Sequence, residues 1–421
     1  MTAASELLST GREVLVVEAA DEVGGLARNV VVRDYIFDIG GHRFFTEKEY
    51  LRQWLRELLG DELIIIKRRS RIYLNGRLID YPISTINAFF GMGVGRSLNV
   101  LAGYIKARMS ASGPQENFEQ WVVARFGRPL YDLYFGPYTK KVWGRDPAQI
   151  SAEWAEQRIQ LLSLTHAIYK SLVNIGPRPK TFAAHFDYPK KGIGRIAAAL
   201  QRKIEAKNGK IICGRSVKKI ALDQSGRFQV ETQNGSSYEA AQVVSTIPLS
   251  KLASALGEPF HAGALEYRSL RCVFLIIKRP KVTDDTWMYF SGPGTIFSRL
   301  HEPKNWSAAM VPGEQTSLCL EVFCDEGDEI WNMPSSQLHD HCIRDLEKLG
   351  LLAGGDVELA TDLRVSDAYP VYLVGYEKTL DGFKKMIQKF PGLSILGRTG
   401  GFRYFNMDQV IDEGIRFARD Y

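Results

Sequence analysis

Glu18 and the glycine pair Gly24 and Gly25 are the first residues whose types and spacing indicate chemistry. Glu18 ends the apolar run EVLVVE, and the glycines follow six residues later, with Leu26 directly after them. A carboxylate at the end of the second strand of a dinucleotide-binding unit accepts hydrogen bonds from both ribose hydroxyls, and glycines let the backbone approach the same ligand. An acidic strand end disfavours a 2′-phosphate, so the pattern predicts FAD or NAD rather than NADP. A surface glutamate before a glycine turn is the alternative.

A second group of candidates lies in the stretch FDIGGHRFF, which holds Gly40, Gly41 and His42. Paired glycines allow the backbone to lie against a flat ring. His42 and Arg43 can donate hydrogen bonds toward a polar edge of that ring or toward a phosphate. The alternative is a tight turn with a structural histidine.

Near the C-terminus, Arg398 follows a glycine at the end of a buried strand, and Met407 and Asp408 open a helix. Backbone N–H groups at a helix start stabilise negative charge, which suits the N1 and O2 atoms of a flavin. These three residues join the cofactor-binding candidates, together with Val217 on a strand-like stretch in the middle of the chain.

The elements that must position these residues belong to a nucleotide-binding fold. Residues 2–9 predict a helix and residues 13–18 a strand, in the order of the second half of a βαβ unit. The strand and GxGxxG loop that would come first are not in the sequence. We expect Met1 to be an internal methionine of a longer reading frame, and the chain as given to hold FAD poorly. The alternative is a chain that has lost its phosphate cradle.

The predicted fold is α/β, or α+β overall, with a Rossmann-like FAD-binding domain built from discontinuous segments. Amphipathic helical patterns interrupt the nucleotide fold, and strands such as CVFLIIK, WMYFS and SLCLEVF come later, with one helix around Ser335 to Leu349. We therefore expect a helical insertion lobe and an antiparallel-sheet substrate lobe. The FAD-binding domain is assigned residues 1–82, 187–252 and 386–421, the helical lobe 83–186 and the substrate lobe 253–385.

Composition narrows the classes of function. The 421 residues include 54 Lys and Arg and 48 Asp and Glu, and this charge of +6 suits an anionic small ligand. The sequence has no repeated pattern of basic and aromatic residues, so binding to nucleic acid is not expected. Five cysteines without CxxC spacing predict a reducing, cytoplasmic setting and no metal site.

The sequence shows no signal peptide and no segment apolar enough to span a membrane. Residues 83–109 come closest, but Arg96, Lys106 and Arg108 interrupt them. Peripheral membrane contact is left open for this segment.

Taken together, EAADEVGG, the FDIGGH turn and the C-terminal glycine and helix stretch resemble the flavin amine oxidase superfamily. Within it the chain is most similar to the UDP-galactopyranose mutases, and the similarity extends through nearly the whole chain. It rests on ENFEQWVVARFGRPLYDLYFGPYTKKVWG with its YTxKxW element, on IFSRLHEPK, on YPV and on GRTGGFRYFNMDQV. Flavoproteins of the protoporphyrinogen oxidase type share much of this skeleton.

The resemblance implies which residues would hold a nucleotide-diphosphate sugar. Tyr138 would stack on the uracil ring and Trp143 would wall the same pocket, because aromatic faces suit that contact. Arg299 would clamp the diphosphate with the hydroxyls of Tyr369 and Tyr404, because a guanidinium fork matches phosphate oxygens. The alternatives are that the two aromatic residues only pack the helical lobe and that the arginine is an ordinary strand-end charge.

By the same resemblance, Arg158 would be a second, mobile phosphate ligand. Two positions depart from the mutase pattern. Asn406 stands where an Asp is usual before Met407, which removes a negative charge near the cofactor, and Phe45 stands where a further His is usual. Both changes bear on substrate choice and redox tuning.

The leading hypothesis is an FAD-dependent mutase that interconverts pyranose and furanose forms of a nucleotide-diphosphate sugar. As the family implies, reduced flavin N5 would be the nucleophile, so no catalytic side chain is required, which agrees with the lack of a Ser/His/Asp, paired-carboxylate or metal-binding constellation. The alternative is an FAD-dependent oxidoreductase of the amine oxidase or protoporphyrinogen oxidase type. A second alternative is an N-terminally truncated, inactive flavin-fold protein.

The expected partner is a UDP-sugar used in making cell-surface polysaccharide. Nucleic acid and an integral membrane segment are not expected, and a homodimer is left open.

Overall fold

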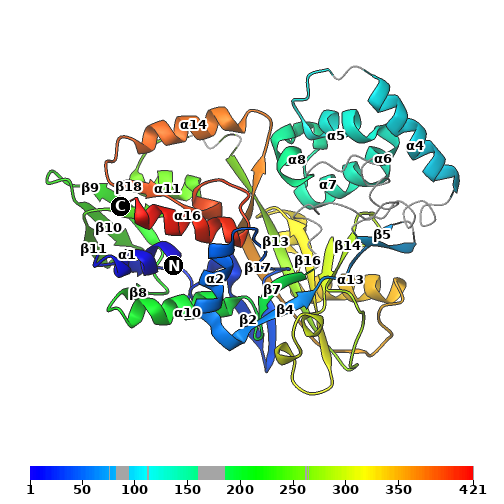
Figure 1. The fold of residues 1–421 in the computed structure, drawn as a ribbon, viewed down its shortest axis with the longest axis horizontal. Helices are drawn as coiled ribbons and strands as arrows, with labels where there is room; N and C mark the ends of the chain where they lie inside the picture. Colours follow the sequence, from blue (N-terminus) through cyan, green and yellow to red (C-terminus); the bar gives the residue numbers. More distant parts are fainter. Residues whose placement is uncertain are drawn as a thin grey trace.

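The structure, a computed structural model, describes residues 1–74, 76–81, 94–110, 113–159, 185–260, 263 and 265–420. Helices and short strands that include both termini form one end of the molecule, a large sheet lies in the middle, and a group of helices lies beside the sheet (Figure 1).

The part that holds both termini contains parallel strand pairs that join distant segments of the chain. β1 (Leu15–Val17) pairs with β8 (Lys210–Ile212), and β12 (Val243–Ser245) pairs with β18 (Leu393–Ile395). Parallel neighbours need long crossover connections, so this arrangement belongs to an α/β fold. Three helices lie beside these strands: α1 (Thr2–Ser9), α10 (Gly194–Glu205) and α16 (Met407–Arg419).

Helix α1 packs against both α10 and α16. Gly414 permits the close approach of α16, because a Cβ added there would lie 3.0 Å from the backbone nitrogen of Ala3. Segments separated by nearly the whole chain therefore share one interface. This assembly from discontinuous segments confirms the predicted Rossmann-like fold class.

Further elements complete this part of the molecule. They are β2 (Asn29–Val32), β3 (Tyr35–Asp38), α2 (Glu49–Leu59), β4 (Leu63–Lys67), β7 (His185–Pro189), β9 (Val217–Leu222), β10 (Phe228–Thr232), β11 (Ser237–Ala240), α11 (Leu249–Leu256), α14 (Tyr376–Ile387) and α15 (Gly397–Gly400). β2 pairs with β3 and β4 with β7, while β9, β10 and β11 form an antiparallel meander. Short 3₁₀ turns lie at η1 (Gly25–Ala27), η2 (Gly60–Glu62), η6 (Pro303–Asn305) and η7 (Ala308–Met310).

The largest sheet among the described residues has seven strands in the order β17-β13-β16-β15-β14-β5-β6. Their bounds are β17 (Val357–Tyr372), β13 (Leu265–Ile277), β16 (Thr316–Cys324), β15 (Arg299–His301), β14 (Trp287–Phe290), β5 (Ser70–Leu74) and β6 (Arg77–Tyr81). All neighbours are antiparallel except β14 and β5.

The two faces of this sheet differ because side chains alternate along each strand. Leu300 and Leu320 point to the face covered by α13 (Ser335–Lys348), where they share an apolar cluster with Leu338. Arg299 precedes Leu300 and Glu321 follows Leu320, so these two charged side chains lie on the opposite face of the sheet. A short helix, α12 (Glu329–Asn332), precedes α13.

The helical lobe is made of α4 (Val94–Met109), α5 (Phe118–Phe126), α6 (Arg128–Leu130), the π-helical turn η3 (Tyr131–Phe135), α7 (Gly136–Trp143), η4 (Pro147–Gln149) and α8 (Ala152–Arg158). Asn117 caps α5 by accepting the N–H of Gln120, and Ser151 caps α8 in the same way through Glu153. Gly144 ends α7 in the left-handed conformation that glycine adopts without strain. Gly144 thus determines where α7, the helix that carries Tyr138, ends.

Several sequence expectations agree with these elements and others do not. The expected first helix is α1, the strand of residues 13–18 is shortened to β1, and the helix around Ser335 is α13. Helices α2 and α14 were not expected, and α14 lies within the stretch assigned to the sheet lobe. The division of the chain at residues 82, 186, 252 and 385 stays a prediction. Among the described helices, none has the length and apolar character needed to cross a membrane.

Candidate functional site

A cavity of about 1220 Å³ lies between the part that holds the termini and the large sheet. It brings together residues from both ends and the middle of the sequence. The predicted site residues that line it are Glu18, Gly24, Gly25, Leu26, Gly41, His42, Arg299, Tyr369, Arg398, Tyr404, Met407 and Asp408.

Glu18 stands at the edge of this cavity because it follows β1 directly. Its N–H donates to the carbonyl of Ile212 at 2.9 Å, which extends the pairing of β1 with β8 by one residue. One carboxylate oxygen accepts the N–H of Ala20 at 2.9 Å. The carboxylate is thus held at a strand end facing the cavity, where it can accept hydrogen bonds from a ribose.

Gly24 shows why a glycine is required beside Glu18. Its φ is +111°, a conformation that other residues rarely adopt, and a Cβ there would lie only 2.9 Å from the Cβ of Ala197 on α10. Gly25 also has a positive φ and begins the turn η1. The backbone of this turn therefore faces the cavity without side chains in the way.

The turn at Gly40, Gly41 and His42 lies against the sheet. Gly40 has a φ of +75°, and a Cβ there would lie 3.1 Å from the carboxyl carbon of Glu321. The N–H of Gly41 donates to Glu321 Oε1 at 3.1 Å. Burial, with Arg398 nearby, lowers the pKa of His42 to about 4, so its imidazole is neutral at neutral pH.

Asp38 anchors this turn from behind. Its carboxylate accepts from Tyr188 Oη at 2.7 Å, from Asn29 Nδ2 at 2.7 Å and from the N–H of Ile193 at 3.0 Å. Burial raises the pKa of Asp38 to about 7 even though these three hydrogen bonds favour the charged form. The contacts tie β3 to β7 and to the start of α10, and so set the position of the glycines.

Arg299 lies on the cavity face of the sheet within a set of polar side chains. Its Nη1 is 3.0 Å from Glu321 Oε2, and it donates to Tyr138 Oη from Nε at 3.3 Å and to Tyr369 Oη from Nη1 at 3.4 Å. Arg299 and Glu321 are directly opposite each other on β15 and β16. The Glu321 side chain is 2% exposed and that of Arg299 23%. One carboxylate therefore holds the guanidinium and the glycine turn together.

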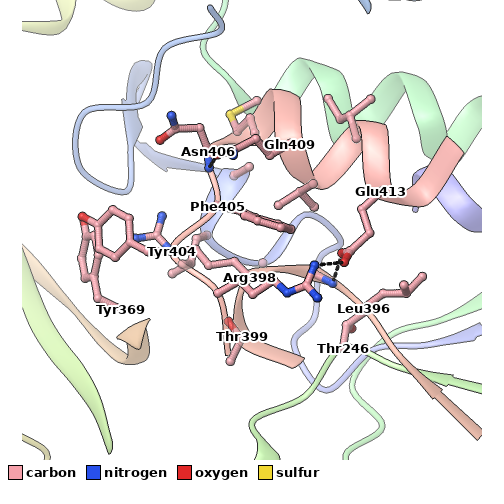
Figure 2. A pocket seen from close by; sticks show the side chains of 18 of the residues that line it. Thr246, Tyr369, Leu396, Arg398, Thr399, Tyr404, Phe405, Asn406, Gln409 and Glu413 are labelled. Atoms are coloured by element: carbon pink, nitrogen blue, oxygen red, sulfur yellow. Dashed lines mark hydrogen bonds and ion pairs between the residues drawn. The ribbon is translucent and has the colours of Figure 1, made fainter. Parts of the chain in front are cut away.

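Arg398 forms a second cationic centre in the cavity. Its guanidinium carbon lies 4.4 Å from the ring centroid of Tyr369 and 4.5 Å from that of Tyr404, within the range of a cation–π contact. The two rings stack with centroids 5.6 Å apart. Nε and Nη2 of Arg398 are buried and have no hydrogen-bond partner among the described residues. Figure 2 shows Tyr369 and Tyr404 side by side near the start of α16.

The start of α16 faces the same cavity. Asn406 and Gln409 form a capping box, in which each side chain accepts from the backbone N–H of the other. Further along this helix, Glu413 accepts the N–H of Gly397 at 2.6 Å. Asn406 therefore acts as the helix cap although it departs from the usual mutase residue, and the helix N-terminus with Met407 is directed at the cavity.

Other predicted site residues lie outside the described lining. Trp143 is 2% exposed and packs edge-on against Tyr369 and Tyr404, so it stands behind these rings. Tyr138 is not among the lining residues, but its hydroxyl accepts from Arg299, which lines the cavity. Val217 is half-buried at the start of β9. Arg158 ends α8, and its side chain lies outside the described part of the structure.

Sequence reasoning missed Glu321. It is a charged residue in the middle of the apolar run LCLEVFC, and it becomes the buried partner of Arg299. A charge in a fully buried strand must be paired or hydrogen-bonded, so the interruption of this run was the available indication.

The residues present fit a flavin dinucleotide. A strand-end carboxylate, a glycine turn at which a Cβ would collide with α10, and a helix start all face one cavity. The unpartnered nitrogens of Arg398 suit an anionic ligand. Among the described residues, no group of three or more His, Cys, Asp or Glu side chains is arranged to hold a metal ion.

This fold and site define a flavin-binding α/β enzyme. Residues 1–420 match the family described as flavin containing amine oxidoreductase, and the chain belongs to that family. The family assignment confirms the predicted membership of the flavin amine oxidase superfamily and the predicted cofactor, FAD.

Individual relatives divide between two kinds of protein. By sequence, the chain is 22% identical over 413 residues to protoporphyrinogen oxidase 1 of Spinacia oleracea, covering 88% of this chain and 72% of that protein. It is 28% identical over 156 residues to a probable UDP-galactopyranose mutase of Klebsiella pneumoniae, covering 35% of this chain and 39% of that protein.

Solved structures show the same division. A reduced UDP-galactopyranose mutase superposes with a TM-score of 0.86 at 23% identity, covering 99% of this chain and 92% of that one. A putative protoporphyrinogen oxidase from Exiguobacterium superposes with a TM-score of 0.78 at 16% identity, covering 100% and 95%. At these identities the likeness establishes the fold.

Proposed function

We propose that the protein is an FAD-dependent mutase that interconverts the pyranose and furanose forms of a nucleotide-diphosphate sugar. The observation that carries the proposal is the Arg299 guanidinium, which lines the cavity beside the hydroxyls of Tyr138 and Tyr369. A guanidinium group beside hydroxyl groups matches the charge and geometry of a diphosphate.

FAD would be held by the residues whose placement fits it. Glu18 would accept hydrogen bonds from the adenosine ribose, the backbone at Gly24 and Gly25 would lie along the dinucleotide, and the start of α16 at Met407 would meet the negative edge of the flavin ring. When bound and reduced, FAD would supply an electron-rich ring nitrogen as the nucleophile toward the sugar.

The side chains around the diphosphate stabilise it as a leaving group. Arg299 offers charge that Glu321 only partly offsets, and the hydroxyl of Tyr369 stays protonated because burial raises its pKa. Burial likewise raises the pKa of Tyr138 to about 12, so at neutral pH its hydroxyl is uncharged and accepts from Arg299 without offsetting the guanidinium charge. His42 is neutral at neutral pH, so it adds no positive charge to the cavity.

An oxidoreductase of the amine oxidase or protoporphyrinogen oxidase type is the competing function. A protonated amine would be repelled by the guanidinium groups of Arg299 and Arg398, because like charges in a half-buried cavity are weakly screened. Because protoporphyrinogen oxidases are among the sequence relatives, an oxidoreductase activity is the result that the experiment must exclude.

The test uses protein loaded with FAD and reduced with dithionite. We expect UDP-galactopyranose to yield the furanose form, detected by anion-exchange chromatography, and no conversion by the oxidised protein. Arg299→Lys should lower turnover at least about tenfold because the fork to the phosphate is lost. Arg403→Lys is the matched control, since Arg403 is an exposed lining residue.

Two results would contradict the proposal. One is an absence of furanose from a reduced, FAD-loaded sample that still binds uridine diphosphate. The other is bleaching of the oxidised flavin by an amine or a porphyrinogen, which would identify an oxidoreductase. The cytoplasmic location, the nucleotide-sugar partner and the homodimer stay predictions.

A further inference from the structure

Helix α4 of the helical lobe carries a row of exposed apolar side chains. Leu98, Leu101, Ile105 and Met109 are 55%, 41%, 50% and 82% exposed. We call these four residues the α4 stripe. They account for four of the ten large hydrophobic side chains that are exposed in the described part of the chain, so the clustering on one helix is marked.

The α4 stripe lies along one side of the helix. Its members are spaced by three, four and four residues, which at about 100° per residue places them within an arc of about 80°. The buried side of α4 is a different one: Val100 and Tyr104 are 8% and 3% exposed, and α4 packs there on α5 and α6. The approach is close, since a Cβ added at Gly103 would lie 2.5 Å from Pro129. The α4 stripe is therefore not the surface by which α4 joins the lobe.

Charge on α4 has one sign only. The helix VGRSLNVLAGYIKARM contains Arg96, Lys106 and Arg108 and no acidic residue. At about 100° per residue, Arg108 falls just beyond one edge of the α4 stripe and Lys106 beyond the other. An apolar strip bordered on both sides by cations is the pattern of a helix that lies in the surface of an anionic membrane.

Position in the molecule leaves this helix accessible. Figure 1 shows α4 at the outer edge of the helical lobe, at the opposite end of the molecule from α1 and α16. Among the described helices none can cross a membrane, so contact with lipid would be made from the surface.

We propose that α4 docks the protein onto an anionic lipid surface, with the α4 stripe inserted between the headgroups and the upper acyl chains. Leu98, Ile105 and their neighbours would leave water, while Lys106 and Arg108 would contact lipid phosphates. A second copy of the chain suits the stripe less well, because pairing two α4 helices would bring like charges together without compensating acids.

Vesicle co-sedimentation tests the proposal with the FAD-loaded full chain. We expect the protein to sediment with vesicles of phosphatidylcholine containing about one third phosphatidylglycerol, to bind much less to phosphatidylcholine alone, and to be released as salt rises. The double variant Leu98→Gln with Ile105→Gln should lower the bound fraction at least about tenfold at unchanged flavin content. Lys106→Gln with Arg108→Gln should remove the preference for the anionic vesicles.

The matched control is Val31→Gln with Ile65→Gln, which changes two residues of similar type on β2 and β4 that are 64% and 68% exposed. This variant should bind vesicles as the unchanged protein does. The proposal is overturned if the unchanged protein does not sediment with the anionic vesicles or if the control variant loses binding equally. It is also overturned if the α4 stripe variant alters the sedimentation coefficient without lipid, which would make the stripe a contact between protein chains.

Discussion

Glu321→Gln separates the two effects of the buried carboxylate on Arg299. In the native site Glu321 places the guanidinium and also offsets its charge from 3.0 Å. Glutamine has nearly the same shape but no charge, so the variant should bind uridine diphosphate more tightly. The same variant should be less stable, since the amide accepts from only one of the two donors, Arg299 and Gly41, at a cost of about 1–3 kcal/mol.

The expected gain in affinity follows from the geometry. A phosphate on the far side of the Arg299 guanidinium would lie about 7 Å from the Glu321 carboxylate, where an effective dielectric constant of about 40 gives a repulsion of about 1.2 kcal/mol. Adding a weaker contribution from the second phosphate gives roughly 1–2 kcal/mol. The dissociation constant of uridine diphosphate should therefore fall about five- to thirtyfold.

Quenching of tryptophan fluorescence measures this constant, because Trp287 lines the cavity. Glu377→Gln is the matched control: Glu377 is an exposed lining carboxylate, and its removal should change the affinity by less than about twofold, because water and salt screen an exposed charge. The reasoning is refuted if Glu321→Gln binds uridine diphosphate no more tightly than the native protein while its flavin content is normal.

Three further predictions concern the cofactor turn, the buried acid and the aromatic face. Gly24→Ala should lower the ratio of bound FAD to protein and cost about 1–3 kcal/mol of stability, because the φ of +111° and the contact with Ala197 exclude a Cβ; the absorbance ratio at flavin and protein wavelengths checks this. Because Asp38 has its pKa raised from 3.8 to about 7, the folded state keeps its proton, and stability from this group is lost as pH rises through that interval. Compared with Asp38→Asn, the native protein should lose up to about 4 kcal/mol across it in urea unfolding, and parallel curves for the two proteins would contradict the assignment. Tyr138→Phe should change the affinity for uridine diphosphate less than about threefold, because only the 3.3 Å contact to Arg299 is lost. Tyr138→Ala should weaken this affinity at least about tenfold, because the aromatic ring is lost as well. Equal effects of the two variants would exclude stacking of Tyr138 on the uracil ring.

The sequence was most informative where a local pattern determines the structure. Glu18 was predictable because an apolar run that ends in a carboxylate indicates a strand and its end. Helix α2 was equally predictable but was overlooked: its buried residues Leu51, Leu55 and Leu59 repeat every four positions.

Contacts between residues that are far apart in the sequence could not be predicted. The contact of Arg299 with Glu321 depends on the register of β15 and β16, which no short stretch of sequence specifies. The stacking of Arg398 on Tyr369 likewise joins a helix start to a distant strand. Trp143, which the family resemblance assigned to the wall of the nucleotide pocket, packs edge-on against Tyr369 and Tyr404.

The packing of α1 against α16 has a consequence for synthesis in the cell. The ribosome makes α1 long before α16, so the face of α1 that packs on α16 stays uncovered until the C-terminal part of this chain has emerged, although α10 is made earlier. At about 5–20 residues per second, this interval is roughly 20–80 seconds. During that time the Glu18 edge of the cavity exists without the Met407 edge, and a tight cofactor site cannot form. FAD capture is therefore a late event in biogenesis, and ribosome-bound chains that lack α16 should present an open, chaperone-accessible apolar surface.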